Sequence, residues 1–304
     1  MRHLLKLSDL SPEELLSLLN FAKGIRRRPA DYSSACAGKV LASLFFEPST
    51  RTRLSFESAM LRMGGNVVGF ADVSSSSAQK GESPEDTCRM VSIYSDIVAV
   101  RHPVAHTPEK MAAVSRIPVI NAGDGANEHP TQTLADMFAI HDRFGAFGGL
   151  TVGICGDLKY GRTVHSLIAA LAPFASTRFI LISPPELAVP GEYLDGLDGR
   201  RLIFSPDLEK NLPELDVLYM TRIQKERFQD YAEYHRLSGR YILNKEKMRR
   251  AKKNMIVLHP LPRVDEISPD MDDDSRAWYF KQAEGAFFCR MALIMRLLGL
   301  EREI

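Results

Sequence analysis

The clearest absence in this sequence is an excess of charge of either sign. Its 39 lysines and arginines are matched by 38 aspartates and glutamates, so the formal net charge of the 304 residues is +1. A protein that binds nucleic acid or an anionic membrane over a broad surface usually carries a basic excess. We therefore expect neither nucleic acid nor membrane as a partner, and any positive potential must be local.

Cysteine is also scarce. The four cysteines, Cys36, Cys88, Cys155 and Cys289, lie far apart in the sequence and form no Cys-x-x-Cys motif. The usual signature of a zinc site or a thiol redox site is therefore missing. We expect all four cysteines to be buried free thiols.

Long apolar runs are missing as well. No stretch approaches the ~20 residues that a helix needs to cross a bilayer. Residues 11–14 read SPEE, which is a capping box with proline at the first helical position. We expect a folded start here rather than a signal peptide. Together these features predict a cytoplasmic protein.

The length and the apolar pattern predict two domains. A chain of 304 residues with 45% hydrophobic residues is globular in composition, and it exceeds the usual domain size of about 150 residues. Apolar runs alternate with helical patterns along the whole chain. Strands are predicted at 40–46, 66–70, 97–100, 118–120, 150–155, 179–183, 201–204, 216–220 and 255–258.

This alternation predicts an α/β fold of two doubly wound domains, each a parallel sheet flanked by helices. The dipeptides Ser83-Pro84 and Thr107-Pro108 repeat the cap-then-proline start of a helix. A helix at 130–144 leads to Gly145, Gly148 and Gly149, where we place the boundary. The first domain is then 1–144, the second is 145–284, and a C-terminal helix within 285–304 packs back on the first.

One segment after a predicted strand gathers groups that bind anions. Residues 46–53 read FEPSTRTR, with three hydroxyls and two guanidinium groups where the strand ends and a helix begins. The free N–H groups and the dipole of a first helical turn favour phosphate, and Ser, Thr and Arg add donors. An ordinary N-cap with solvated arginines is the alternative, but the whole cluster favours an anion site.

In the predicted second domain, residues 156–163 read GDLKYGRT and differ from a P-loop by Arg162 in place of lysine. Bulky residues such as Leu158 and Tyr160 argue against a loop that places successive N–H groups on phosphates. A dinucleotide site is less favoured still, because Gly153-x-x-Gly156 lacks the G-x-G-x-x-G spacing. We favour a role for the Arg162 guanidinium in binding a carboxylate.

A second arginine follows the predicted strand at 216–220. Arg222 and Gln224 alternate in sequence, so both can face one ligand. Two arginines on separate strand ends suit a small dicarboxylate, because each binds a carboxylate in bidentate fashion. Surface salt bridges of Arg222 with Glu226 or Asp230 are the alternative.

Three further segments carry polar groups at strand ends. Residues 259–263 read HPLPR, and their prolines stiffen the backbone and leave carbonyl groups free, although a rigid turn without function is as good an interpretation. Arg101 follows the strand predicted at 97–100. His129 and Gln132 open the helix at 130–144, where His129 can donate to an oxyanion or simply cap the helix, and Gln132 can accept from an amide.

The polar stretch at 74–82 contains Ser76 and Lys80. We expect a mobile loop here. Such loops are usually only solvated, but a lysine on one can also cover a charged ligand. The run of serines at 74–77 is the only low-complexity patch, and we find no sequence repeat.

Taken together, these motifs resemble the aspartate carbamoyltransferase family, in order and over nearly the whole chain. The resemblance implies transfer of the carbamoyl group of carbamoyl phosphate to L-aspartate in pyrimidine synthesis, with no metal and no organic cofactor. The motifs are STRTR at 49–53, KGE at 80–82, RHP at 101–103, HPTQ at 129–132, GDLKYGRTVHSL at 156–167, TRIQKER at 221–227 and HPLPRVDEI at 259–267.

The resemblance also implies roles for the matching residues. The phosphate would be held by Ser49, Thr50, Arg51 and Thr52. The carbamoyl oxygen would be polarised by Thr52, Arg101 and His129, and the carbamoyl amide bound by Gln132 and the carbonyls of Pro260 and Leu261. Arg162 would take one aspartate carboxylate, and Arg222 with Gln224 the other.

The resemblance further implies a homotrimer with shared sites. Ser76 and Lys80 match residues that reach into a neighbouring subunit's site, Ser76 toward carbamoyl phosphate and Lys80 toward aspartate. A regulatory chain is a possible additional partner in this family.

Two other functions stay open. Ornithine carbamoyltransferases share the S-T-R-T type of phosphate site, but their His-Cys-Leu-Pro signature has cysteine where this chain has Pro260. A non-catalytic binder of phosphorylated metabolites would keep the same fold without the reaction. Product formation separates all three.

Overall fold

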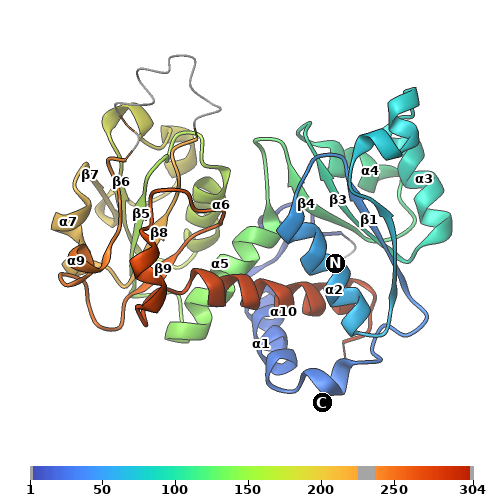
Figure 1. The fold of residues 1–304 in the computed structure, drawn as a ribbon, viewed down its shortest axis with the longest axis horizontal. Coiled ribbons are helices and arrows are strands. Elements are labelled where there is room, and N and C mark those ends of the chain that lie inside the picture. The colour runs from blue at the N-terminus through green and yellow to red at the C-terminus, as the bar shows by residue number, and fades with distance from the viewer. Residues whose placement is uncertain (1–2, 225–236, 238, 302–304) are drawn as a thin grey trace. The chain divides into compact units, whose positions relative to one another are not determined.

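The computed structural model describes residues 3–224, 237 and 239–301 of the chain (Figure 1). The chain divides into two compact units, Met1–Phe138 with Glu284–Ile304, and Ala139–Ala283. Both divisions fall inside helices, namely α5 (Pro130–Phe144) and α10 (Tyr279–Leu297). The sequence interpretation had placed the first boundary at the glycines after α5, because glycines end helices, whereas the contacts of α5 are divided between the units.

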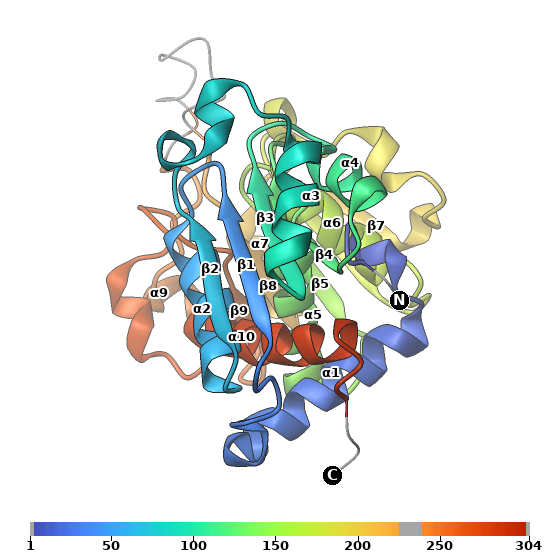
Figure 2. The same cartoon turned by 90° about the vertical axis from the view of Figure 1, so that its right-hand side faces the viewer.

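The first unit contains a parallel sheet with the strand order β2-β1-β3-β4. The helices α3 and α4 cover one face, where Cys88 and Met111 pack against Ala42, Val98 and Val100, and α2 lies on the other face (Figures 1 and 2). The bounds are β1 (Val40–Phe45), β2 (Asn66–Phe70), β3 (Ile97–His102), β4 (Val119–Asp124), α1 (Pro12–Arg27), α2 (Thr50–Arg62), α3 (Pro84–Tyr94) and α4 (Thr107–Val114).

The C-terminal helix completes the core of the first unit. Ala292, Leu293 and Ile294 of α10 are fully buried. The buried Arg290 donates from its guanidinium to Ser55 Oγ on α2 at 3.0 Å. From Glu284 onward α10 belongs to the first unit, the domain on which the sequence interpretation expects the C-terminal helix within 285–304 to pack.

The second unit contains a parallel sheet with the strand order β7-β6-β5-β8-β9. Its central strands are buried on both faces, as their continuous apolar sequence requires. The bounds are β5 (Thr151–Cys155), β6 (Arg178–Ile182), β7 (Leu202–Ser205), β8 (Val217–Met220), β9 (Ile256–Leu258), α6 (Arg162–Leu171), α7 (Leu208–Asn211) and α9 (Lys245–Met248).

The predicted fold class is confirmed, with each predicted strand present in one of the two parallel sheets. One local prediction was wrong. The helix α4 is capped by His106, whose φ is 63°, and Thr107 is already helical. In the stretch at 74–82, which the sequence predicts to be a mobile loop, the structure contains two short 3₁₀ helices, Val73–Ser75 and Ser77–Lys80.

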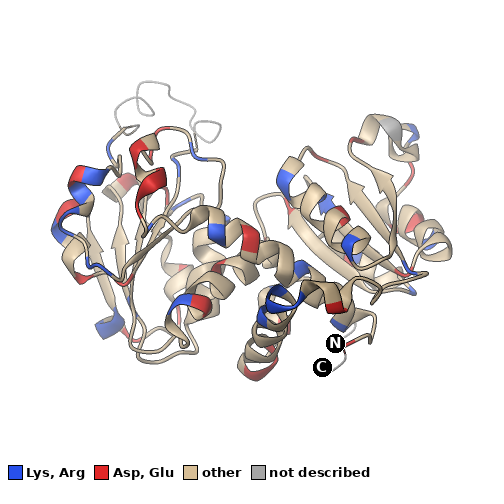
Figure 3. Ribbon diagram, turned by 60° about the horizontal axis from the view of Figure 1, so that its bottom comes forward, with Lys and Arg blue, Asp and Glu red and all other residues tan. Residues whose placement is uncertain are grey.

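The surface and the cysteines agree with the composition. Lysine and arginine are interspersed with aspartate and glutamate along the ribbon (Figure 3). All four cysteines are buried free thiols. No helix among the described residues is long and apolar enough to span a membrane.

Candidate active site

The residues of the first unit that are predicted to bind the phosphate and the carbamoyl group follow the carboxyl ends of its strands. Parallel pairing sets Phe45 of β1 beside Arg101 of β3, and His102 of β3 beside Asp124 of β4. The Phe46 N–H donates to the Arg101 carbonyl at 2.9 Å. The segments after β1, β3 and β4 therefore share one edge of the sheet, where a doubly wound fold binds its ligand.

The start of α2 leaves its donors available. Ser49 is the N-cap with extended φ of −157°, but its side chain caps no N–H group among the described residues. Thr50, Arg51 and Thr52 form the first turn of the helix. Because the first N–H groups of a helix have no partner within the helix, this turn presents donors and a positive dipole to an anion.

Two cations lie close together at this edge. Burial lowers the pKa of the Arg51 guanidinium, and the nearby positive charge of Arg101 lowers it further. The Arg101 Nε lies 2.7 Å from Glu47 Oε1, yet its N–H is not aligned for a hydrogen bond, and this buried nitrogen has no hydrogen-bond partner among the residues that the structure describes. We regard the contact as an ion pair without a hydrogen bond, so Arg101 retains donor capacity.

The other arginine of the STRTR motif is used differently. Arg53 Nε lies 3.6 Å from Glu57 Oε1 one turn along α2, and the Ser43 hydroxyl donates to the same carboxylate oxygen at 3.0 Å. The sequence had suggested two guanidinium groups for the anion. The structure gives Arg53 a carboxylate partner instead.

The loop after β4 ends at His129, and Gln132 lies in the first turn of α5. His129 is buried, and its Nδ1 lies 3.5 Å from Thr131 Oγ1. Gln132 Nε2 donates to Asp136 Oδ1 at 2.8 Å. With its amide nitrogen engaged, Gln132 keeps its carbonyl oxygen as an acceptor, which is the role predicted for it.

Ser76 and Lys80 follow β2 in the same unit. The Ser76 hydroxyl donates to the Val73 carbonyl at 2.8 Å. Lys80 ends a 3₁₀ helix and is exposed. Within the described residues, neither side chain has a hydrogen bond or an ion pair to Arg51, Arg101 or His129, so this chain by itself does not join them to that group.

Three acid-base residues near this edge resemble a metal site. One ligand atom each from His106, Glu109 and Asp124 lie within 4.8 Å of one another. However, Asp124 Oδ1 accepts from Asn121 Nδ2 at 2.9 Å and Glu128 N at 3.0 Å. Its Oδ2 accepts from the His106 N–H at 2.8 Å and from Asn127 Nδ2 at 2.9 Å. These bonds occupy the carboxylate, so we regard the cluster as structural.

In the second unit the predicted carboxylate-binding residues follow β5 and β8. Arg162 is the first residue of α6, and Arg222 and Gln224 follow β8. The Gln224 N–H donates to the buried Asp157 at 3.4 Å. The two loops are thereby joined. Glu226 and Asp230, the alternative partners of Arg222, lie outside the described residues.

The loop after β5 does not function as a P-loop. The Asp157 N–H donates to Thr221 Oγ1 at 3.1 Å, and the Asp157 carboxylate accepts the Tyr160 N–H at 3.0 Å. A Cβ on Gly156 would lie 2.2 Å from the Thr221 carbonyl oxygen. The glycine allows close contact with the β8 loop, and a carboxylate occupies the place that a P-loop reserves for phosphate.

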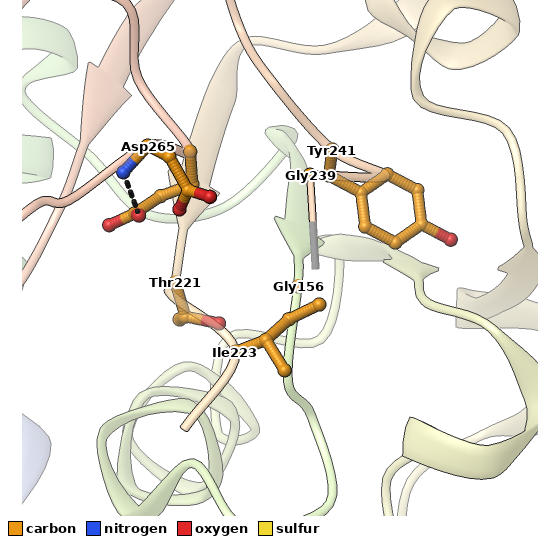
Figure 4. A pocket seen from close by; sticks show the side chains of 7 residues that line it. Gly156, Thr221, Ile223, Gly239, Tyr241 and Asp265 are labelled. Atoms are coloured by element: carbon orange, nitrogen blue, oxygen red, sulfur yellow. Dashed lines mark hydrogen bonds between the residues drawn. The ribbon is translucent and has the colours of Figure 1, made fainter. Parts of the chain in front are cut away.

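A small pocket lies beside these loops, lined in part by Gly156, Thr221 and Ile223 (Figure 4). Tyr241 and Glu266 also line it. Ile223 lines the pocket, whereas its neighbours Arg222 and Gln224 are not among the lining residues. It contains none of the predicted carboxylate-binding residues.

The sequence interpretation missed the side chains that fix the HPLPR loop. His259 Nε2 lies 2.6 Å from Glu266 Oε1, and His259 Nδ1 accepts the Leu261 N–H at 2.8 Å. The Gln282 side chain accepts the His259 N–H at 2.9 Å. Both His259 and Glu266 belong to the HPLPRVDEI motif, but sequence alone does not reveal that they pair.

Arg263 in the same motif is a structural residue. Its Nη1 donates to the Tyr279 hydroxyl at 3.0 Å, and its guanidinium also binds the Asp272 carboxylate at 2.5 Å. The HPLPR loop is thus held at both ends, which leaves Pro260 and Leu261 between fixed points.

Comparison with known proteins agrees with this arrangement. Residues 2–142 match the family model "Aspartate/ornithine carbamoyltransferase, carbamoyl-P binding domain", and residues 148–297 match the "Asp/Orn binding domain". The aspartate carbamoyltransferase catalytic subunit of Clostridium novyi is 54% identical over 302 residues, 99% of each chain.

Two solved structures have the same fold. The catalytic subunit of M. jannaschii aspartate transcarbamoylase has a TM-score of 0.91 and 44% identity over 98% of each chain. The Trypanosoma cruzi aspartate transcarbamoylase with carbamoyl phosphate and aspartate has a TM-score of 0.88 and 38% identity, covering 96% of this chain and 95% of that one. The chain therefore belongs to the aspartate/ornithine carbamoyltransferase family.

Proposed function

We propose that this chain transfers the carbamoyl group of carbamoyl phosphate to the amino group of L-aspartate, with N-carbamoyl-L-aspartate and phosphate as products. The observation that carries the proposal is the pair of close cations, Arg51 and Arg101, beside a helix start whose N-cap side chain is unused. Such an edge binds a phosphorylated substrate. The full-length relatives named aspartate carbamoyltransferase supply the reaction.

In this proposal the first unit holds the phosphorylated substrate. Ser49, Thr50, Arg51 and Thr52 bind the phosphate, while Thr52, Arg101 and His129 polarise the carbamoyl oxygen. Gln132 accepts from the carbamoyl amide, together with the carbonyls of Pro260 and Leu261. Ser76 contributes to the same substrate from a neighbouring subunit.

The second unit selects the amino acid. Arg162 binds one carboxylate of aspartate, and Arg222 with Gln224 binds the other. Lys80 of a neighbouring subunit adds a further cation. Planar guanidinium groups suit carboxylates, whereas a cysteine and an acidic residue would suit the amine of ornithine.

The reaction needs little beyond position and charge. The aspartate amine attacks the carbamoyl carbon, the new C–N bond forms, and the carbonyl oxygen becomes an oxyanion. The C–O bond to phosphate then breaks, and the leaving phosphate takes the proton of the amine. Donors aimed at the oxyanion and close approach of the two substrates account for the acceleration, and the mechanism calls on no metal or organic cofactor.

The working assembly in this proposal is a homotrimer, because Ser76 and Lys80 serve a neighbouring site. A regulatory chain is a further possible partner. We also propose a cytoplasmic location, which the four buried free thiols support.

The first test is an assay of the purified chain with carbamoyl phosphate and, in parallel, L-aspartate or L-ornithine, without added metal or nucleotide. Carbamoyl-aspartate is the expected product. Citrulline would show that the second unit binds ornithine, and no product with either amino acid would favour a non-catalytic binder.

A further inference from the structure

Leu261 has a backbone conformation that leucine rarely adopts. Its φ is 52°, in the left-handed region, where a branched side chain crowds the backbone. Such a conformation persists only when the surrounding structure holds it, and it often marks a functional position. Leu261 is also one of the two residues whose carbonyls we assign to the carbamoyl amide.

The His259 side chain holds this conformation. The Leu261 N–H donates to His259 Nδ1 at 2.8 Å. In a trans peptide the N–H and the preceding carbonyl point in opposite directions, and Pro260–Leu261 is not among the cis bonds of the described residues. The Pro260 carbonyl therefore points away from the imidazole and is left as an acceptor.

Glu266 fixes the tautomer of His259. Glu266 Oε1 lies 2.6 Å from His259 Nε2, so the ring proton is on Nε2 and Nδ1 is free to accept. Glu266 Oε2 accepts the N–H groups of Val264 and Asp265 at 3.2 and 3.1 Å. Both partners are almost fully buried, so neither ring nitrogen serves a substrate directly.

We propose that His259 and Glu266 are positioning residues for the carbamoyl amide. Glu266 sets the imidazole tautomer, the imidazole sets the Leu261 peptide, and the Pro260 carbonyl is thereby aimed at the substrate amide. This proposal rests on the proposed function, since it concerns the same carbamoyl phosphate site.

Two isosteric substitutions separate the two ends of the imidazole. In His259→Asn the amide oxygen takes the place of Nδ1 and can still accept the Leu261 N–H. In His259→Gln the amide nitrogen takes the place of Nε2 and can still donate to Glu266, but the acceptor for Leu261 is lost. Each variant is thus the matched control of the other.

We expect His259→Gln to raise the KM for carbamoyl phosphate and lower kcat by about tenfold or more, because misplaced groups cost rate steeply. His259→Asn should retain clearly more of both kinetic parameters than His259→Gln, because it keeps the acceptor for the Leu261 N–H. The KM for L-aspartate and the inhibition constant of inorganic phosphate should not change in either variant, because Arg222 and the α2 turn are untouched.

A structural role alone predicts another result. Equal losses in the two variants, or losses that follow the melting temperature, would overturn the proposal, as would a parallel rise of the phosphate inhibition constant. If His259→Gln fails to fold, Glu266→Gln provides the test. Its amide oxygen can accept the Val264 and Asp265 N–H groups, and its amide nitrogen then faces His259 Nε2, so the ring proton moves to Nδ1 and the acceptor for the Leu261 N–H is lost. Absence of carbamoyl-aspartate with the wild-type chain would instead refute the proposed function.

Discussion

Arg51 and Arg53 stand two residues apart in one motif and have different surroundings. Arg51 lies beside the charge of Arg101, whereas Arg53 forms an ion pair with Glu57. We expect Arg51→Ala to lower turnover by about 100-fold or more, as for a lost donor to a developing charge. Steady-state kinetics with circular dichroism as a check of folding measures this.

Arg53→Ala is the matched control for that prediction. It removes the same type of side chain from the same helix, but the guanidinium that is lost is paired with the Glu57 carboxylate. Activity should stay near the wild-type value. Equal losses in Arg51→Ala and Arg53→Ala would mean that the charge of α2 as a whole, and not the Arg51 guanidinium, matters.

Selection of aspartate can be tested at Arg222. Lysine keeps the charge but cannot bind a carboxylate in bidentate fashion. We expect Arg222→Lys to raise the KM for L-aspartate by about tenfold, equivalent to ~1.4 kcal/mol, with the KM for carbamoyl phosphate unchanged. If only the KM for carbamoyl phosphate rises, Arg222 does not bind aspartate.

Glu266 gives a prediction about pH. Burial raises the pKa of this carboxyl, but the hydrogen bonds from His259 and the backbone outweigh burial, so the pKa lies below its ordinary value of 4.5. A carboxyl with a lowered folded pKa stabilises the protein above its unfolded pKa, and this contribution is lost as the pH falls through the folded pKa. Urea unfolding of the wild type should therefore become easier below about pH 4.5.

The comparison with Glu266→Gln isolates this carboxyl from the other acids. The variant should be less stable at neutral pH, and its free energy of unfolding should depend less on pH between about pH 4.5 and pH 3. An identical pH dependence in both proteins would show that Glu266 does not hold its charge by these bonds.

The sequence predicted which side chains lie at strand ends but not their partners. Arg51, His129 and Arg222 could be placed because each directly follows or precedes a clear strand or helix pattern. The pairing of Arg53 with Glu57 was missed because the motif was read as a whole. The pairing of His259 with Glu266 depends on how a loop folds back, which local patterns do not encode.

Elements were predicted best where local chemistry fixes their ends. Ser11 and Ser83 accept helix N–H groups as expected, each followed by proline. Thr107 looked alike in sequence, but its hydroxyl lies 3.1 Å from His102 Nδ1 and donates to the Val104 carbonyl at 2.9 Å. These partners in the turn just before the helix therefore displaced the cap, and α4 starts one residue earlier than the sequence indicated.

The pairing of β1 with β2 depends on a glycine. Gly69 has a φ of 147°, and a Cβ there would lie 2.0 Å from the Ser43 carbonyl oxygen. We expect Gly69→Ala to lower the free energy of unfolding by about 2 kcal/mol or more, because backbone atoms cannot move aside cheaply. Urea unfolding measures the difference.

Gly24→Ala is the contrasting substitution. Gly24 is inside α1, and a Cβ there meets nothing within 4 Å. Alanine should raise the free energy of unfolding by roughly 0.5–1 kcal/mol. Destabilisation by both substitutions alike would show that the Ser43 contact is not the cause at Gly69.

Shared sites can be tested on the whole assembly. His129→Ala and Lys80→Ala should each be nearly inactive alone, because every site of either trimer lacks one group. Mixed trimers should recover about a quarter of the wild-type activity, since a site can combine an intact His129 from one subunit with an intact Lys80 from another. Dissociation, mixing and reassembly followed by the activity assay measures this.

Failure of the mixture to recover activity would place each site within one chain. A mixture of His129→Ala with Arg51→Ala is the control. In the proposal both residues of a site come from the same subunit, so every site in the mixture lacks one of them and the mixture should stay inactive. Recovery in that control would point to exchange of whole units rather than to shared sites.

The first unit is built from two separate stretches of chain, whereas the second is one continuous stretch, Ala139–Ala283. Residues 284–297 of α10 supply buried side chains to the first unit, yet a ribosome makes them after the whole second unit. Since chains emerge with the N-terminus first, the second unit can close its core while the first still lacks a helix. The unit whose synthesis begins first is therefore the last to complete its fold.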